Sequence, residues 1–585
     1  MSNIIGISAY FHDSACCLLQ NGKLIAAAQE ERFTRIKHDA SIPYNAIKFC
    51  LSEAKLSLAE IDCIVFYENP EKKLSRQLWN GVQNVSKELF KRLSPSRFET
   101  EIRDVLGFNG EIKYFDHHLS HAASSFYFSG YDQSAILTTD GVGEWATTTY
   151  GMGDGNKIEL SEEVHFPHSL GLLYSTITNY IGFKVNGGEY KVMGLAPYGK
   201  PKYLEEFRSL ITMKEKGQFE LNMDFFTFQN PKAMFTEKLA MLLGQPKRPP
   251  ESNIAQFHKD VARSLQSLLQ EVLLEKSLYL YEETKSKNIC LAGGVALNCV
   301  ANAYLLKHGP FDNMFVQPAA NDSGGALGAA VAAHYEMGGG PIKDNPLQHV
   351  YLGPEFSDYS VKRLINSSGL NVTDKTGNPD GLSKTVASMI ANGKVVGWFQ
   401  GRMEFGPRAL GNRSILADPR SPEMRDRINA MVKKREAFRP FAPAVLESHS
   451  KEHFDLDHPS PFMLETCQVI SSLDLPAITH VDNSARVQTV TPESNPRFAA
   501  LLKAFNEITS CPILLNTSFN VRGEPIVCTP EDALKCFIKT DIDCLVLNGY
   551  IIEREKNPME IKAYLLNLLG ETAVSGIEHD AYTFM

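Results

Sequence analysis

Residues 116–144 read DHHLSHAASSFYFSGYDQSAILTTDGVGE. His117 and His121 are four residues apart, so on a helix both imidazoles lie on one face. An apolar, strand-like run at 135–137 follows, and Asp140 comes shortly after it. Imidazole and carboxylate donors together suit Fe(II), Mn(II) or Zn(II). The stretch therefore predicts a helix beside a strand, and either a metal held by His117, His121 and Asp140 or a pair of histidines that only make hydrogen bonds at the surface or in the core. His118 could replace His117 if the helix were rotated.

The chain begins with a pattern that this stretch repeats. Residues 4–9, 15–19 and 23–29 are apolar strand-like runs, and a polar turn at 10–14 separates the first two. Residues 135–139 likewise enter the polar turn Asp140-Gly141-Val142-Gly143, and a second run follows at 147–151. Two unrelated hairpins would give the same pattern. The alternative is an internal duplication. A duplicated nucleotide-binding fold needs such a pattern, because turns from both halves approach the phosphates of the nucleotide.

Two further polar turns follow apolar segments. We expect a long amphipathic helix at 253–284 and a buried strand at 288–291 that enters Gly293, Gly294 and Asn298. Glycines at such a turn let the backbone approach an anionic ligand closely. The turn at 317–328 contains Asp322, which we expect to be either a fourth metal ligand or the N-cap of the alanine-rich helix after it.

The composition changes near residue 355. Residues 356–380 are rich in Ser, Asn, Asp and Gly, which indicates a linker between a first domain, 1–355, and a second, 381–585. Basic residues outnumber acidic ones between 402 and 439, although the chain carries a net charge of -9. Arginines in the loops GRMEFGPRALGNRS and KKREAFRPFAP can bind phosphate in a bidentate manner. The turn from Asn516 to Phe519, directly after an expected strand, is a further candidate ligand turn.

The overall composition narrows the class of protein. The length of 585 residues indicates more than one domain. The net charge of -9 argues against a broad surface that binds nucleic acid. The 11 cysteines include no CxxC pair, which is typical of reduced, cytoplasmic proteins. Neither a signal-peptide pattern nor a long apolar run is present, so we expect no membrane partner. Walker A, GxSxG and HExxH motifs are absent as well.

Taken in order, the motifs resemble those of the O-carbamoyltransferases of the NodU/CmcH type. The resemblance spans nearly the whole chain. It rests on the stretches GISAYFHDSA, AAQEERFTRIKHD, DHHLSHAASSF, TTDGVGE, GGEYKVMGLAPYG, LAGGVALN, NDSGGALG, GRMEFGPRALGNRSIL, KKREAFRPFAP, HVDNSARVQTV and NTSFNVRGEPIV.

The resemblance implies an α/β fold in two parts. The first is a duplicated actin-like ATPase (ASKHA) domain, and the second is an α/β domain similar to threonylcarbamoyl-adenylate synthases. The family's second domain converts carbamoyl phosphate and ATP, with Mg2+, to carbamoyl-adenylate and pyrophosphate. Its first domain then transfers the carbamoyl group to a hydroxyl of a small-molecule acceptor, a secondary metabolite such as an antibiotic or toxin, and releases AMP.

The resemblance also assigns site residues. The metal ligands would be His117, His121, Asp140 and Asp322, and the family's metal is iron, whereas the donor set alone also accepts Mn(II) or Zn(II). His12 would be the catalytic general base, oriented by Asp13. The nucleotide would contact Glu189, Lys191, Gly194, Gly293, Gly294, Asn298, Asn321 and Gly324. Carbamoyl phosphate would contact Arg408, Lys433, Arg439, Arg486, Asn516 and Ser518; Lys434 is an alternative to Lys433.

Two other functions remain open at this stage. One is a tRNA threonylcarbamoyl-transfer protein, against which the acidic chain counts; the other is a non-catalytic ATP-binding regulator. The sequence identifies neither the acceptor, whose pocket we place in the loops at 205–250, nor the oligomeric state, for which a homodimer is one option.

Overall fold

The structure is a computed structural model that describes residues 2–80, 91–228, 230, 233–433, 436 and 438–557. The chain divides into two compact units. Of the described residues, unit 1 contains those in 2–30 and 40–347, and unit 2 contains Glu31–Asp39 and those in 348–557. Among the described residues, no helix has the length and apolar character needed to cross a bilayer.

Unit 1 contains a first five-stranded sheet with the order β3-β2-β1-β4-β5. β1 is antiparallel to β2 and β2 to β3, whereas β1, β4 and β5 run parallel. The strands are β1 Asn3–Ser8, β2 Ala15–Gln20, β3 Lys23–Gln29, β4 Cys63–Phe66 and β5 Glu111–Tyr114. β1, β2 and β4 are almost entirely buried, which agrees with their continuous apolar sequences.

A second five-stranded sheet repeats this arrangement, with the order β12-β11-β6-β7-β8. β6, β7 and β8 form an antiparallel meander, and β6, β11 and β12 run parallel. The strands are β6 Gln133–Thr139, β7 Ala146–Asp154, β8 Lys157–His165, β11 Asn288–Ala292 and β12 Asn313–Val316. The same connectivity in both halves confirms the predicted internal duplication.

Helices α6 and α13 pack against each other in unit 1. Gly328 makes this approach possible, because a Cβ at this position would lie 1.7 Å from the Ser120 carbonyl oxygen. α13 also lies on β1, and α6 lies on β6 and β11. The helices of unit 1 are α2 Tyr44–Ala54, α3 Pro70–Trp79, α5 Arg97–Glu101, α6 His117–Phe126, α7 Leu170–Tyr180, α8 Glu189–Leu195, α9 Leu204–Arg208, α10 Glu237–Leu243, α11 Gln256–Thr284, α12 Cys299–His308 and α13 Asp322–Glu336.

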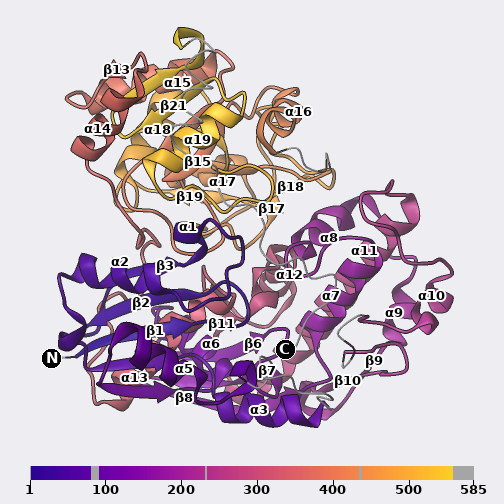
Figure 1. Ribbon diagram of the computed structural model, residues 1–585. Helices are drawn as coiled ribbons and strands as arrows, with labels where there is room; N and C mark the ends of the chain where they lie inside the picture. Colours follow the sequence, from indigo (N-terminus) through magenta and orange to yellow (C-terminus); the bar gives the residue numbers. More distant parts are fainter. Residues whose placement is uncertain are drawn as a thin grey trace. The chain divides into compact units, whose positions relative to one another are not determined.

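The long helix predicted at 253–284 is α11, which begins at Gln256. Figure 1 shows α7, α8, α9, α10 and α11 gathered in magenta as one helical group. A short antiparallel pair, β9 Ile211–Met213 and β10 Phe219–Leu221, lies beside them.

Unit 2 is built on a mixed eight-stranded sheet with the order β13-β22-β21-β14-β15-β20-β16-β19. The strands are β13 Thr373–Asp374, β14 Val396–Phe399, β15 Arg413–Ala417, β16 Ala442–Leu446, β19 Gln488–Val490, β20 Ile513–Ser518, β21 Cys544–Leu547 and β22 Tyr550–Glu553; β17 Cys467–Gln468 and β18 Ser484–Ala485 form a separate pair. The helices are α1 Glu31–Thr34, α14 Asp358–Ser368, α15 Pro379–Ala391, α16 Met424–Ile428, α17 Ser450–His453, α18 Pro496–Thr509 and α19 Pro530–Lys539. Both units therefore have the predicted α/β character.

Two features of unit 2 differ from the domain boundaries that we predict. The stretch 356–380 is not a plain linker, because α14 buries Val361 and Ile365 in the core of this unit and β13 pairs with β22. Residues Glu31–Asp39 also belong to unit 2, where Arg35 donates hydrogen bonds to the carbonyls of Pro525 and Ile526 at 2.8 and 2.7 Å. The polar composition around α14 concealed its two buried apolar positions, and no local pattern marks the Arg35 contacts.

Candidate functional site

Four buried side chains from separate elements of unit 1 meet in one cluster. His117 and His121 come from the first two turns of α6, Asp140 follows β6, and Asp322 is the first residue of α13. The Nε2 atom of His117 lies 3.0 Å from Asp140 Oδ2, 3.1 Å from His121 Nε2 and 3.7 Å from Asp322 Oδ1. His121 Nε2 lies 3.6 Å from Asp140 Oδ2 and 3.8 Å from Asp322 Oδ1. The structure thus brings together the four residues proposed as metal ligands.

Local structure holds these side chains in place. The four-residue spacing places both imidazoles on one face of α6. The amide of Gly294 donates to Asp140 Oδ1 at 3.0 Å, and the Tyr67 hydroxyl lies 3.4 Å from Asp322 Oδ2. Each carboxylate therefore keeps one oxygen toward the imidazoles while a separate donor fixes the other.

Burial and neighbouring charges shift the pKa values of three members of the cluster. Burial alone lowers the pKa of His117, but the hydrogen bond to Asp140 and the charge of Asp322 raise it to about 9. Burial opposes ionisation of Asp140, yet its hydrogen bonds to His117 and His121 hold its pKa well below the usual range. Burial raises the pKa of Asp322. Close carboxylates in a buried site are the environment in which a divalent cation is most strongly stabilised.

The donor geometry fits a single metal ion. Ligand atoms about 2.1 Å from an ion are roughly 3.0–3.4 Å apart at tetrahedral or octahedral angles. The His117–Asp140 and His117–His121 separations, 3.0 and 3.1 Å, agree with this range, and the separations of 3.6, 3.7 and 3.8 Å given above are longer. One donor atom from each residue lies within 4.8 Å of all the others. Two imidazoles and two carboxylates form a donor set that suits Fe(II), Mn(II) or Zn(II).

His118 has a different environment. Its Nδ1 atom lies 2.6 Å from the hydroxyl of Thr138, and it is not a member of the cluster. Burial lowers its pKa well below the usual range, so this imidazole is neutral. Between the two alternatives in the sequence, the geometry favours His117 as the ligand.

His12 and Asp13 lie next to the cluster in the turn after β1. His12 Nδ1 is 3.1 Å from Asp13 Oδ2 and 3.8 Å from Asp322 Oδ2. Burial lowers the pKa of His12, but the charge of Asp322 and the hydrogen bond to Asp13 outweigh it and raise the pKa to about 10. Asp13 and Tyr10 both have positive φ angles, 52° and 78°, which are costly for residues other than glycine. Such a strained turn is typical of a functional site.

Several residues proposed to bind the nucleotide are close to the cluster. Asn321 donates to Asp13 Oδ2 at 2.8 Å and accepts from Ser323. Gly293 has a φ of +89°, and a Cβ there would lie 2.3 Å from the Thr139 carbonyl. Gly324 is the third residue of α13, and a Cβ on it would lie 2.1 Å from the Ala319 carbonyl. These positions require a glycine for close packing, whether or not a nucleotide binds.

Other nucleotide candidates already have structural partners. Asn298 caps α12 by accepting from Ala301 and exchanges two hydrogen bonds with Gln266, at 3.0 and 3.1 Å. Glu189 accepts from Ser175, Asn186 and Gly188. Lys191 lies over the ring of Phe183, 5.3 Å from its centroid. Gly194 is in α8. Nucleotide contacts by these residues stay predictions.

The anion-binding candidates all lie in unit 2. Within the described chain, Arg486 Nε and Asn516 Oδ1 are buried and make no hydrogen bond. The amide nitrogen of Asn516 donates to Gln488 Oε1 at 2.8 Å, and Ser518 donates to Asn520 at 2.7 Å. Arg408 and Arg439 are half-buried in loops. The side chains of Lys433 and Lys434 lie outside the described residues.

Arg413 illustrates how a loop arginine can instead be structural. It is fully buried, lies 3.6 Å from the Phe399 ring centroid and donates to the carbonyls of Gln400 and Pro354, at 2.7 and 3.1 Å. Burial lowers its pKa to about 10. Of the arginines in the basic stretch, this one is committed to holding the loops together.

Glu144 is a residue of the site that sequence reasoning missed. Its carboxylate accepts from the backbone amides of Asn69 and His117 at 2.6 and 2.9 Å, so it fixes the start of α6. It is 4% exposed, and burial raises its pKa. The sequence feature that could have identified Glu144 is its position in the motif TTDGVGE, four residues after Asp140.

Unit 1 is a duplicated α/β unit with two equivalent five-stranded sheets and a buried His/Asp cluster. The family model described as "Carbamoyltransferase N-terminus" matches residues 3–331, and "Carbamoyltransferase C-terminus" matches residues 387–554. The chain belongs to the carbamoyltransferase family and is a carbamoyltransferase.

Named relatives support this assignment. The chain is 46% identical to the uncharacterized protein sll1178 of Synechocystis over 600 aligned residues, which cover 95% of this chain and 98% of that protein. It is 40% identical to the nodulation protein NolNO of Sinorhizobium fredii over 561 residues, covering 94% of this chain and 80% of NolNO. It is 42% identical to the nodulation protein NolO of Bradyrhizobium diazoefficiens, covering 75% and 79% of the two chains.

Solved structures are more distant. Component A of the (R)-2-hydroxyglutaryl-CoA dehydratase of Acidaminococcus fermentans is 14% identical with a TM-score of 0.32, covering 58% of this chain and 100% of that one. HypF of T. kodakarensis is also 14% identical with a TM-score of 0.32, covering 59% and 50% of the two chains.

Proposed function

We propose that this carbamoyltransferase is an ATP-dependent O-carbamoyltransferase that works in two half-reactions. In unit 2, carbamoyl phosphate and water give carbamate and phosphate. A carbamate oxygen then attacks the α-phosphorus of ATP, bound with Mg2+, and forms carbamoyl-adenylate while pyrophosphate leaves. In unit 1, a hydroxyl oxygen of a small-molecule acceptor attacks the carbamoyl carbon, the bond to the adenylate oxygen breaks, and AMP leaves.

The observation that carries the proposal is the cluster of His117, His121, Asp140 and Asp322 in a chain of this family. These residues would hold a divalent metal, and Fe(II) is our proposal for its identity. When bound, the metal would supply Lewis-acid stabilisation of charge on the adenylate phosphate. The N-termini of α6 and α13 both begin at the cluster, and a helix N-terminus favours an anion.

His12 would accept the acceptor's proton when a bound cation offsets the charge of Asp322, which otherwise raises the pKa of His12 and keeps the imidazole protonated. It lies in the turn after β1, with Nδ1 toward Asp13 and Asp322 and with 18% of its side chain exposed. Asp13 fixes the ring through the 3.1 Å contact, and Asn321 in turn donates to Asp13. A positioned imidazole of this kind is a typical general base in the attack of a hydroxyl on a carbonyl.

For the first half-reaction, unit 2 would bind the anionic substrate carbamoyl phosphate. Arg408, Arg439 and Arg486 would bind the phosphate of carbamoyl phosphate, because charge-assisted hydrogen bonds to a phosphate are among the strongest that a side chain makes. The unsatisfied atoms Arg486 Nε and Asn516 Oδ1 support a polar ligand in this unit. Lys433 and Ser518 are further proposed contacts.

The test separates the two half-reactions. Purified protein receives isotopically labelled carbamoyl phosphate, ATP and Mg2+ without an acceptor, and mass spectrometry measures carbamoyl-adenylate. We expect His121→Ala to form carbamoyl-adenylate at the wild-type rate and to lose AMP release from supplied carbamoyl-adenylate. Arg439→Ala should show the reverse. His165→Ala, in an exposed part of β8, and Arg425→Ala, in α16, are matched controls.

Three results would count against the proposal. Loss of both half-reactions in a folded His121→Ala protein would contradict their assignment to separate units. ATP binding without any carbamoyl-adenylate would favour a non-catalytic regulator. Transfer of a threonylcarbamoyl group to tRNA would favour the tRNA-modifying alternative.

A further inference from the structure

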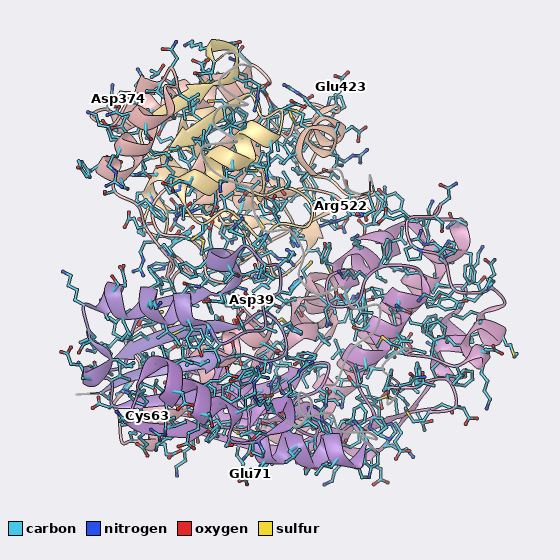
Figure 2. All side chains as sticks on the ribbon, in the orientation of Figure 1. Asp39, Cys63, Glu71, Asp374, Glu423 and Arg522 are labelled. Carbon is cyan, nitrogen blue, oxygen red and sulfur yellow. The ribbon has the colours of Figure 1, made fainter. Side chains whose placement is uncertain are left out.

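Two buried amide side chains of unit 2, Asn516 and Gln488, form a hydrogen-bonded pair. Asn516 belongs to β20 and Gln488 is the first residue of β19, with β16 between the two strands. The nitrogen Nδ2 of Asn516 donates to Gln488 Oε1 at 2.8 Å. Asn516 is 1% exposed and Gln488 is 2% exposed, whereas Arg522, labelled in Figure 2, follows β20 in an exposed loop. The pair therefore has to find its hydrogen-bond partners inside the unit or in a ligand.

Two consecutive backbone carbonyls decide how each amide is oriented. Gln488 Nε2 donates to the carbonyl of Leu410 at 2.8 Å. Asn516 Nδ2 donates to the carbonyl of Ala409 at 3.3 Å, in addition to Gln488 Oε1. A carbonyl can only accept, so both side chains must present a nitrogen to this loop. The nitrogen of Asn516 is thereby committed to two acceptors, and its oxygen Oδ1 is the atom that remains for a ligand.

The loop that carries the two carbonyls is itself held in place. The carboxylate oxygen Oε1 of the buried Glu404 accepts from the amide of Leu410 at 2.7 Å and from two further amides of the loop at 2.9 and 3.2 Å. The hydroxyl of Tyr351 donates to the carbonyl of Leu410 at 2.8 Å. The orientation of the amide pair therefore rests on a fixed segment of backbone.

Three of the proposed phosphate contacts are close to this pair along the chain. Arg408 directly precedes the two residues that supply the carbonyls, and Arg486 is two residues before Gln488. Ser518 is two residues after Asn516 in β20, and side chains two apart along a strand lie on the same face. A phosphate bound by these residues would bring the rest of its molecule to the amide pair.

The remaining oxygen of Asn516 lacks a donor. Within the described chain, Asn516 Oδ1 is buried and accepts no hydrogen bond. A buried acceptor without a donor costs free energy, so the atom favours a ligand that brings an N–H or O–H group. A fully ionised phosphate carries acceptors only and cannot supply one. The amino group of carbamoyl phosphate carries N–H donors and can.

We propose that Gln488 is a positioning residue that selects carbamoyl phosphate among acyl phosphates. It holds the nitrogen of Asn516, so that Asn516 Oδ1 accepts a hydrogen bond from the amino group of the substrate. Acetyl phosphate has nearly the same shape but carries a methyl group in this place, and it leaves the oxygen without a donor. This inference rests on the proposed function and adds the basis of its substrate discrimination.

The test measures binding without ATP, so its outcome does not depend on adenylate formation. Phosphonoacetamide and acetonylphosphonate are stable analogues of carbamoyl phosphate and acetyl phosphate, with a methylene group in place of the bridging oxygen. Isothermal titration calorimetry compares the two analogues on the full-length protein. We expect phosphonoacetamide to bind at least about tenfold more tightly, since an unpaired buried acceptor corresponds to roughly a fivefold to 150-fold change in affinity.

Two substitutions of Gln488 form a matched pair. Gln488→Met has a similar length but no acceptor for Asn516 Nδ2, so the Asn516 amide can turn and the preference should fall to about threefold or less. Gln488→Glu keeps an acceptor for Asn516 Nδ2 and should keep a preference of about tenfold. A charge on the new side chain lowers both affinities alike, so the ratio of the two affinities is the readout. Gln468→Met, an exposed change in β17, should bind both analogues as the wild type does.

Several outcomes overturn the inference. These are equal binding of the two analogues to the wild type, an unchanged preference in a folded Gln488→Met protein, and loss of the preference in a folded Gln488→Glu protein. The first and third remain decisive if Gln488→Met does not fold. Equal binding in a protein that forms carbamoyl-adenylate would leave the proposed function standing, whereas a preference that depends on Gln488 in a protein that forms none would refute the proposed activity and keep the site.

Discussion

Lys276, on the buried side of α11, makes the stability of unit 1 depend on pH. Its side chain is 0% exposed and donates to the carbonyl of Gly217. The ammonium nitrogen lies 4.6 and 4.9 Å from the ring centroids of Tyr150 and Phe219. Burial lowers its pKa from 10.5 to about 7, although the charges of nearby carboxylates oppose this.

The direction of the pH dependence follows from the pKa of Lys276 in the folded and in the unfolded chain. Below pH 7 the lysine is charged in both the folded and the unfolded chain, so folding bears the full cost of burying the charge. Between pH 7 and 10.5 the unfolded chain binds more protons, and stability therefore rises with pH. The pKa difference corresponds to about 5 kcal/mol, at roughly 1.4 kcal/mol for each pKa unit.

Lys276→Met removes this cost and its pH dependence. We expect the variant to be more stable than wild type, that is, to have a larger free energy of unfolding. This gain should be about 2 kcal/mol greater at pH 7 than at pH 9. Urea denaturation of both proteins at the two pH values, followed by tryptophan fluorescence, measures this difference. Lys307→Met, an exposed change on α12, is the control. A difference that does not vary with pH would refute the reasoning.

Two glycine substitutions test the packing around the cluster. Gly294→Ala places a Cβ 2.8 Å from Asp140 Oδ1, so we expect about a tenfold to hundredfold weaker retention of Fe(II) or Mn(II) against a chelator, measured by elemental analysis; unchanged retention would contradict the link. Gly328→Ala places a Cβ 1.7 Å from the Ser120 carbonyl, so we expect a lower melting temperature and yield. Gly340→Ala, with nothing within 4 Å, should match wild type in both assays.

The sequence was sufficient for features that depend on local spacing. The duplicated meander could be predicted because both halves repeat apolar runs and polar turns at similar intervals. The pairing of His117 with His121 follows from helical geometry alone. Asp322 also fits the cluster, but only the resemblance made it a ligand, since an aspartate at the start of a helix is equally expected as a cap.

Features that depend on tertiary contacts could not be read from the sequence. Arg413 and Arg486 both lie in motifs on which the resemblance rests, yet the first is committed to backbone carbonyls and the second has an unsatisfied buried nitrogen. Nothing local distinguishes an arginine that holds a loop from one that binds a ligand. The assignment of Glu31–Asp39 to unit 2 has the same cause, because its partners are nearly 500 residues further along the chain.

The duplication explains why the cluster forms where it does. α6 follows the first sheet but packs on the second, and α13 follows the second sheet but packs on the first. His117 and Asp322 are the first residues of these equivalent helices, while Asp140 and His12 lie in the equivalent turns after β6 and β1. Each half thus contributes one helix start and one turn, and neither half holds a complete donor set. A change that separates α6 from α13, such as Gly328→Ala, should therefore weaken metal retention although it alters no ligand.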